Sequence, residues 1–221
     1  MVLRHFFWAV SLPFTLLMAP PATFGQGTNV LLSKSRLPSV ERKQALGVWL
    51  TNSPSPLYYD QQNIKQAVDE LEQAGFSVLY PNVWSRGTTF HTSEFAPIEP
   101  ALKSAGVTVD PICTLSKEAH KRGMKVVPWF EYGLMEPASA KVVQNNPNWV
   151  LSRANGDPVM KMHGKEMVWL NPAHPQVRER FIGLVVEVMK RCRMDGLQLD
   201  DHFAWPVELG YDPYTSGLYD F

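Results

Sequence analysis

Apolar and polar residues alternate in blocks along the chain, and the blocks predict a repeated order of strand and helix. An apolar run at Leu46–Thr51 predicts a strand, because a cluster of Asn, Ser and Pro follows it directly. Downstream, apolar residues recur at the spacing of one helix face, at Ile64, Ala67, Val68 and Leu71. Asp60 is placed to cap this helix and Gly75 to end it. These residues predict one complete strand–helix unit.

The same order recurs further along the chain. The remaining predicted strands are 76–81, Lys125–Glu131 and Leu197–Asp200. Asp110 and Pro111 predict the start of the helix between the first two of these, and Gly123 predicts its end. Pro175 begins the last predicted helix, and Gly196 precedes the last strand. Repeated units of this kind predict an α/β fold, in which helices cover a parallel sheet.

A parallel sheet of this kind is either an open doubly wound sheet or part of a (β/α)8 barrel. We favour the barrel because polar and aromatic residues fall at the carboxyl ends of the strands, where barrel active sites are built. The first strand also lacks the Gly-rich turn that binds nucleotide phosphates. Only about four units are recognisable. We therefore expect residues 45–221 to form the N-terminal part of a TIM-barrel domain.

The first 25 residues have the features of a secretory signal peptide. A short basic start precedes roughly 13 apolar positions, and small or turn-forming residues follow. A membrane span needs about 20 apolar residues. We therefore expect cleavage near Gly25 rather than an uncleaved anchor, with no stable membrane insertion afterwards. The expected product is an exported protein, periplasmic or extracellular, in which residues 26–44 link the signal to the barrel domain.

Composition and charge narrow the classes of function. Lys+Arg and Asp+Glu both number 21, so the formal net charge is zero, which argues against a nucleic-acid partner. Cys113 and Cys192 are too few for a disulfide scaffold or a four-cysteine zinc site. Export permits a disulfide between them, but we favour two buried free thiols. We expect neither a metal nor a cofactor.

Three carboxylates are the candidate catalytic residues: Glu131, Asp200 and Asp201. Side chains alternate along a strand, so Glu131 and Asp200 end neighbouring strands on the face that points into the barrel. Glycosidic bond cleavage uses such a pair, because one carboxyl protonates the leaving oxygen and the other acts as nucleophile or activates water. Two alternatives stay open for the Asp pair. It could cap a loop or, with His202, ligate a metal.

Aromatic and polar residues near the strand ends favour a sugar as the ligand. Indole and phenol rings stack on the apolar faces of sugars, and Asn and Arg bond the hydroxyls. The candidate substrate-binding residues are Asn82, Trp84, Arg86, Trp129, Tyr132 and His202. For Trp49, which lies within the first strand, we favour ordinary core packing.

Six motifs occur in order: Gly47–Thr51, Tyr80–Gly87, Glu118–Gly123, Pro128–Gly133, Trp169–Pro172 and Asp195–His202. Together they resemble the bacterial glycosyl hydrolase-like 10 family, and cyanobacterial members look most similar. The resemblance implies a (β/α)8 barrel that acts on glycans, in some members on cell-wall polysaccharide. It also implies that Asp200 and Asp201 lie in the active-site segment. The role of Glu131 rests on the predicted strand geometry alone.

The resemblance also raises a difficulty, since members of the family continue well past the last predicted strand. We therefore expect a C-terminally truncated barrel that self-associates through its open sheet edge. If the nucleophile comes from a later strand, as is common in retaining enzymes with this fold, the chain lacks it and is inactive as it stands. The first alternative to a glycoside hydrolase is a non-catalytic glycan-binding protein with an aromatic cleft. The second is another barrel enzyme, such as a metal-dependent hydrolase.

Overall fold

Parallel strands lie side by side in the order in which they occur along the sequence. In the computed structural model, which describes residues 45–51, 55–162 and 164–219, the order within the sheet is β1–β2–β5–β9. The bounds are β1 Gly47–Leu50, β2 Val78–Ser85, β4 Lys125–Val126, β5 Trp129–Phe130 and β9 Gln198–Leu199. The short strand β4 also pairs with β2 in parallel. Sequential parallel neighbours are the arrangement of a (β/α)8 barrel, so the predicted fold class is confirmed for the first part of such a barrel.

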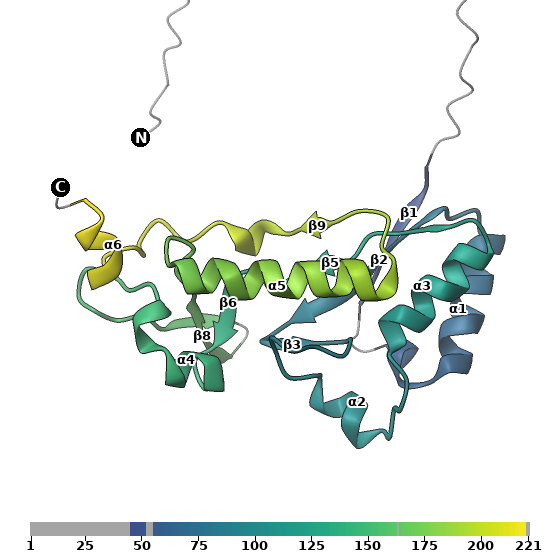
Figure 1. Ribbon diagram of the computed structural model, residues 1–221, viewed down its shortest axis with the longest axis horizontal. Helices are drawn as coiled ribbons and strands as arrows, with labels where there is room; N and C mark the ends of the chain where they lie inside the picture. Colours follow the sequence, from purple (N-terminus) through teal and green to yellow (C-terminus); the bar gives the residue numbers. More distant parts are fainter. Residues whose placement is uncertain (1–44, 52–54, 163, 220–221) are drawn as a thin grey trace, which may run out of the picture. The chain divides into compact units, whose positions relative to one another are not determined.

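Three long helices cover one face of this sheet. They are α1 (Gln61–Gln73), α3 (Pro111–Lys121) and α5 (Pro175–Cys192), and α3 contacts both of the others. The predicted caps are confirmed, since Asp60 accepts from Gln62 N at 2.9 Å and Asp110 from Cys113 N at 3.0 Å. Figure 1 shows α1 and α3 next to each other, and α5 alongside β5 and β9.

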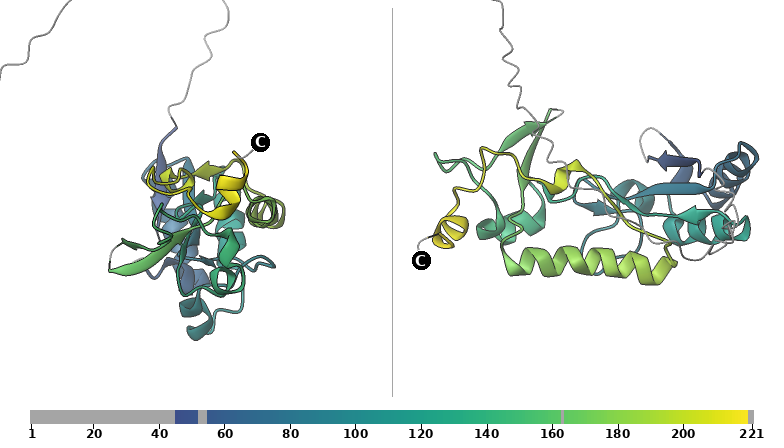
Figure 2. Two further views of the ribbon diagram at one scale, coloured as in Figure 1. Left: turned by 90° about the vertical axis from the view of Figure 1, so that its left-hand side faces the viewer. Right: turned by 90° about the horizontal axis from the view of Figure 1, so that it is seen from above.

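Long excursions leave the strand ends before the chain returns to the helices. The strand β3 (Thr88–Thr89) turns back on β2, and α2 (Pro100–Ser104) follows. After β5 the chain forms a second, antiparallel sheet with the order β6–β8–β7. The bounds are β6 Met135–Pro137, α4 Lys141–Asn145, β7 Met160–Met162, β8 Lys165–Trp169 and, near the end of the chain, α6 Pro213–Gly217. Short 3₁₀ turns are η1 Leu57–Tyr59, η2 Pro147–Trp149 and η3 Asp201–Phe203. Both views of Figure 2 show the green strands β7 and β8 projecting away from α5.

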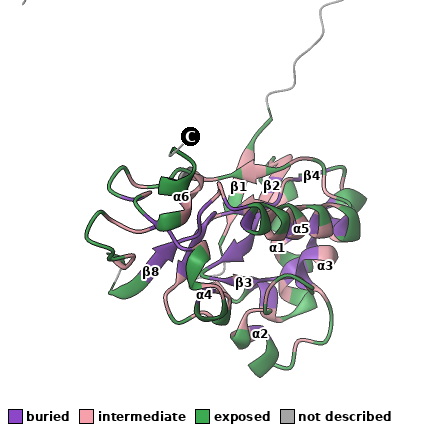
Figure 3. Ribbon diagram, turned by 60° about the vertical axis from the view of Figure 1, so that its left-hand side comes forward, coloured by how far each residue is buried: buried purple, intermediate pink, exposed green. Residues whose placement is uncertain are grey.

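Two hydrophobic cores hold these parts. The larger core lies between the parallel sheet and its helices, with Leu79, Ile112, Phe130 and Leu184 fully or almost fully buried. The smaller core lies under the antiparallel sheet. Figure 3 shows that the buried residues are concentrated in the strands and on parts of the helices.

The last parallel strand has an open apolar face. Gln198 and Asp200 bond to Trp49 and Trp129 of the earlier strands, which fits the predicted alternation. We expected Leu197 and Leu199 to face covering helices, but they are 42% and 48% exposed. The helix α5 packs Leu184 and Val188 into the larger core and leaves Leu197 and Leu199 partly uncovered.

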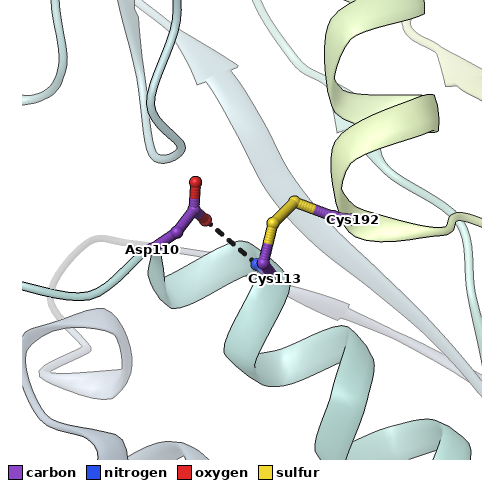
Figure 4. A group of neighbouring side chains, drawn as sticks. All are labelled: Asp110, Cys113 and Cys192. Atoms are coloured by element: carbon purple, nitrogen blue, oxygen red, sulfur yellow. Dashed lines mark hydrogen bonds between the residues drawn. A yellow bond between two sulfur atoms is a disulfide. The ribbon is translucent and has the colours of Figure 1, made fainter.

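The prediction of two free thiols is wrong, because Cys113 and Cys192 form a disulfide that joins α3 to the end of α5 (Figure 4). The two helices follow neighbouring strands, and their packing brings the two Cα atoms to 4.4 Å. Helical periodicity identifies the inner face of each helix, but it does not say which residues of two inner faces meet. Asp110 lies within reach of both sulfur atoms, as a metal ligand would. In the disulfide the sulfurs are bonded to each other, and the Asp110 oxygens accept from Cys113 N and Thr92 N.

The signal peptide predicted for residues 1–25 and the linker predicted for 26–44 lie outside the described residues, as does the side chain of Asp201. Within the described part, no helix is both long and apolar enough to cross a membrane.

Candidate active site

The carboxyl ends of β2, β5 and β9 lie at one edge of the parallel sheet. Asn82 of β2 is level with Trp129 of β5, and Trp129 is level with Gln198 of β9. The strands β5 and β9 (Figure 1) pair in parallel, and Glu131 and Asp200 directly follow them, so both residues lie at the same edge of the sheet. In barrels of this type, this edge is where ligands bind.

The Glu131 carboxylate is fixed by one of its two oxygens. Its Oε2 accepts from Asn82 Nδ2 at 2.6 Å and from Ser85 Oγ at 3.1 Å. Asn82 is held in turn, because its Oδ1 accepts from Trp84 N at 3.2 Å. The other oxygen, Oε1, makes no hydrogen bond with a described residue. The orientation of Glu131 is therefore set by Asn82 and Ser85 through Oε2.

Asp200 is oriented by the neighbouring strand. The Trp129 indole donates from Nε1 to Asp200 Oδ2 at 2.7 Å. A charge-assisted bond of this kind fixes the plane of the carboxylate. Two residues earlier in the chain, Gln198 accepts a similar bond through its Oε1 from Trp49 Nε1 at 3.1 Å. These two indole bonds connect side chains from different strands on the inner face of the sheet.

The loop after β9 packs against the loop after β5. The His202 ring bonds through Nδ1 to the main-chain oxygen of Glu131 at 2.9 Å, and it stacks on Tyr132 with 5.5 Å between the ring centroids. Gly133 allows this close approach, since a Cβ built there would lie 2.6 Å from the His202 carbonyl oxygen. His202 and Tyr132 therefore hold the backbone around Glu131.

Trp84 lies beneath the site rather than on its surface. It is fully buried, and its Nε1 donates to the carbonyl oxygen of Gly133 at 3.0 Å. The Arg180 guanidinium lies 5.3 Å from the centre of its ring and pairs with Glu136 at 2.9 Å. Burial raises the pKa of Glu136, while Arg180 acts in the opposite direction. The structure therefore gives Trp84 a supporting position, in place of the predicted contact with a sugar.

Trp49 is also placed differently from our expectation. We favoured core packing, but its side chain is 55% exposed and stacks on Tyr80 with 5.1 Å between the ring centroids. Both rings belong to the inner face of the parallel sheet, next to Gln198. Trp49 thus adds an open aromatic surface to the site.

Sequence reasoning missed Ser85, although it bonds to Glu131. Strict alternation along β2 would place Asn82 and Ser85 on opposite faces. The pairing of β2 with β5 shifts register between Asn82 and Trp84, and this bulge turns Ser85 toward Glu131. No local pattern in the sequence marks that irregularity.

An open groove of about 580 Å³ lies beside the candidate residues. Its lining residues are Arg86, Glu99, Pro137, Ala138, Ser139, Lys165 and Glu166. Arg86 is exposed and donates from Nε to the Tyr132 hydroxyl at 3.2 Å. Arg86 and Tyr132 therefore connect the groove to the Glu131 loop. The antiparallel sheet, which the sequence did not predict, supplies the opposite wall.

Comparisons with known proteins identify the family of the chain. The profile of the family described as "Glycosyl hydrolase-like 10" matches residues 44–220. The chain is 26% identical to "Glycosyl hydrolase DigH" of Escherichia coli K12 over 208 residues, covering 83% of this chain and 44% of that protein. It is 20% identical to "Glycosyl hydrolase YngK" of Bacillus subtilis, covering 77% of this chain and 35% of that protein. The chain thus spans less than half the length of these curated relatives.

Two solved glycosidase structures share the fold of this chain. An α-galactosidase from Thermus thermophilus matches with a TM-score of 0.54 at 18% identity, covering 78% of this chain and 36% of that one. An α-amylase from Lactobacillus plantarum matches with a TM-score of 0.53 at 16% identity, covering 71% and 38%. At such low identity these likenesses establish the fold alone. With the family profile spanning nearly all of the described residues, the chain belongs to the glycosyl hydrolase-like 10 family.

Proposed function

We propose that the chain performs glycoside hydrolysis on a polysaccharide or a cell-wall-type glycan, with Glu131 and Asp200 as the reacting carboxyl groups. The observation that carries this proposal is the Glu131 carboxylate, which is fixed through Oε2 beside the strand that bears Asp200. Two oriented carboxyl groups provide the acid and the base or nucleophile that the reaction needs. Asp201 stays a predicted third member of the site.

The surroundings of the two carboxyl groups support a sugar ligand. Trp49 offers an exposed ring on the inner face, and Tyr132 and Trp129 are half-buried beside Glu131 and Asp200. Flat aromatic faces next to hydrogen-bonding side chains suit the alternating apolar and hydroxyl surfaces of a sugar. The same aromatic surface favours a second candidate function, a glycan-binding protein without catalysis.

The substitution Asp200→Asn separates the two candidates. If the chain is a hydrolase, we expect this variant to release reducing ends from glycan strands about 10²- to 10⁴-fold more slowly than wild type, because an amide is not an acid or base at neutral pH. Its affinity for the glycan should stay within about threefold, because Asn keeps the shape that Trp129 contacts. Glu72→Gln, an exposed change on α1, is the matched control.

Other results of the same assay would contradict the proposal. Binding by wild type with no hydrolysis of any glycan would instead support the binding protein. Hydrolysis that a chelator abolishes would indicate a metal-dependent enzyme.

We also propose that the protein is exported. The Cys113–Cys192 disulfide supports this proposal, because such bonds persist in oxidising compartments. Reduced thiols in protein purified from its native compartment under thiol-blocking conditions would contradict it.

We further propose that copies of the chain associate through the open edge of β9. The exposed Leu197 and Leu199, on the last strand of the described parallel sheet, support this, since a sheet edge is a template for pairing. We expect sedimentation velocity to detect dimers or larger species whose fraction rises with concentration. The substitution Leu199→Lys should shift the population toward monomer, and a wild-type monomer at every concentration would refute the association.

A further inference from the structure

The turn between β2 and β3 has a backbone conformation that does not suit its residue. Arg86 and Gly87 form a two-residue connection, with φ of 51° and 79°. Positive φ at both positions defines a type I′ turn, for which Asn-Gly is the preferred pair. A long side chain with a Cβ is disfavoured at the first position. The fold alone therefore does not explain why Arg stands here.

The Arg86 side chain is held in a definite position despite its exposure. Its Nε donates to the Tyr132 hydroxyl at 3.2 Å, and its guanidinium carbon lies 5.6 Å from the centre of the Tyr132 ring. Tyr132 in turn stacks on His202, which bonds to the Glu131 backbone. The guanidinium is thus linked by direct contacts to the backbone that bears the candidate catalytic carboxylate. Its two terminal nitrogens make no hydrogen bond with a described residue.

A small cavity of about 130 Å³ lies at this position. Its lining residues are Arg86, Tyr132, Met162, Lys165 and Met167. Two of them are cationic, and no carboxylate is among them. Within the described part of the chain, neither Arg86 nor Lys165 has a carboxylate within 4.0 Å. The larger groove shares both cations and also contains Glu99 and Glu166. Glu131 and Glu99 act electrostatically on Arg86 from beyond 4.0 Å, so the carboxylates that balance Arg86 lie outside the lining of the small cavity.

We propose that this cavity binds a carboxylate carried by a sugar of the substrate, so that the glycan is acidic. The inference rests on the proposed glycoside hydrolysis and deepens it. The forked guanidinium of Arg86 matches the two oxygens of a carboxylate, and the ammonium of Lys165 adds a second charge. Met162 is partly exposed and offers an apolar surface to the carbon atoms of the ring, whereas Met167 is buried. The strained turn is then explained by the group that it presents to the ligand.

The test compares four oligosaccharide probes by isothermal titration. Two carry free carboxylates, one as uronic acid residues and the other as the lactyl ether of muramic acid residues. The other two are the methyl esters of these compounds, which keep the shape and lose the charge. Together they distinguish the two chemical sources of a carboxylate. Wild type should bind at least one acid about 10- to 100-fold more tightly than its ester, as expected for charge-assisted hydrogen bonds.

The substitutions R86N and K165Q identify the groups responsible for the preference. R86N should reduce the preference to less than about threefold, while its melting temperature stays equal or rises, because Asn suits the type I′ turn. A binding loss without a stability loss separates this variant from one that fails to fold. K165Q should lower the preference in part. The matched control is K65Q, which removes an exposed charge from α1 and should leave the preference unchanged.

Each outcome decides a definite point. A preference in only one arm supports the proposal and identifies the carboxylate source. Equal binding of acid and ester by wild type, or a preference that survives in both R86N and K165Q, overturns the acidic subsite but leaves the proposed hydrolysis standing. Failure to bind any of the four probes overturns this inference and counts against the proposed function as well.

Discussion

The substitution Glu131→Gln is expected to reduce glycan hydrolysis by about 10²- to 10⁴-fold, with little change in melting temperature. Gln keeps the size of Glu, and its amide oxygen can still accept from Asn82 Nδ2 and Ser85 Oγ, as Oε2 does now. The exchange therefore removes the ionisable group but not the contacts that orient it. Initial rates of reducing-end release, measured with thermal unfolding, test this expectation.

A second measurement shows whether orientation matters in addition to charge. Ser85→Ala removes the 3.1 Å bond to Oε2 but leaves the carboxyl group in place. We expect a smaller loss in kcat, about fivefold, because one hydrogen bond contributes about 1 kcal/mol. Glu72→Gln again serves as the control. A Glu131→Gln enzyme that retains more than a tenth of the wild-type rate would exclude a reacting role for Glu131.

Removing the disulfide is expected to lower the free energy of unfolding by about 2–5 kcal/mol. The bond joins residues separated by 79 positions, so it strongly restricts the unfolded chain. It also joins α3 to α5, the helices that follow neighbouring strands of the sheet. We expect the double substitution C113S/C192S to shift the urea midpoint downward, as measured by circular dichroism.

Reduction provides the control for this prediction. A reducing agent should destabilise the wild type by nearly the same amount as the double substitution and should leave the double variant unchanged. A loss below about 1 kcal/mol in both experiments would mean that the helix packing alone sets the stability of this region.

The parts of the fold that depend on local signals could be read from the sequence. Asp60 and Asp110 cap the helices that follow them, since a cap needs only a polar side chain beside the free amides of the first turn. Gly75 and Gly123 adopt the positive φ expected after a helix end. Alternation in β9 also gave the inward direction of Gln198 and Asp200, because the strand there is regular.

The parts that depend on contacts between distant residues could not be predicted in this way. The antiparallel sheet after β5 is built from short strands, and its register is set by pairing such as that of Met135 with Trp169. The Cys113–Cys192 bond depends on how two helices pack, and Ser85 reaches Glu131 only through a bulge. Trp49 is exposed although it lies in an apolar strand, because its face of the sheet is open.

The antiparallel sheet has its own hydrophobic core, separate from that of the parallel sheet, while Tyr132 packs against both. Because the two cores are separate, substitutions in the antiparallel sheet need not disturb the packing of the parallel sheet. The candidate acids follow barrel strands, whereas Met162, Lys165 and Met167 come from the antiparallel sheet or its hairpin. Under the proposed function, replacing residues between β6 and β8 would alter which glycan binds while Glu131 and Asp200 stay in place. The excursion after β5 is therefore a natural module to exchange when a barrel of this family is redesigned for a new polymer.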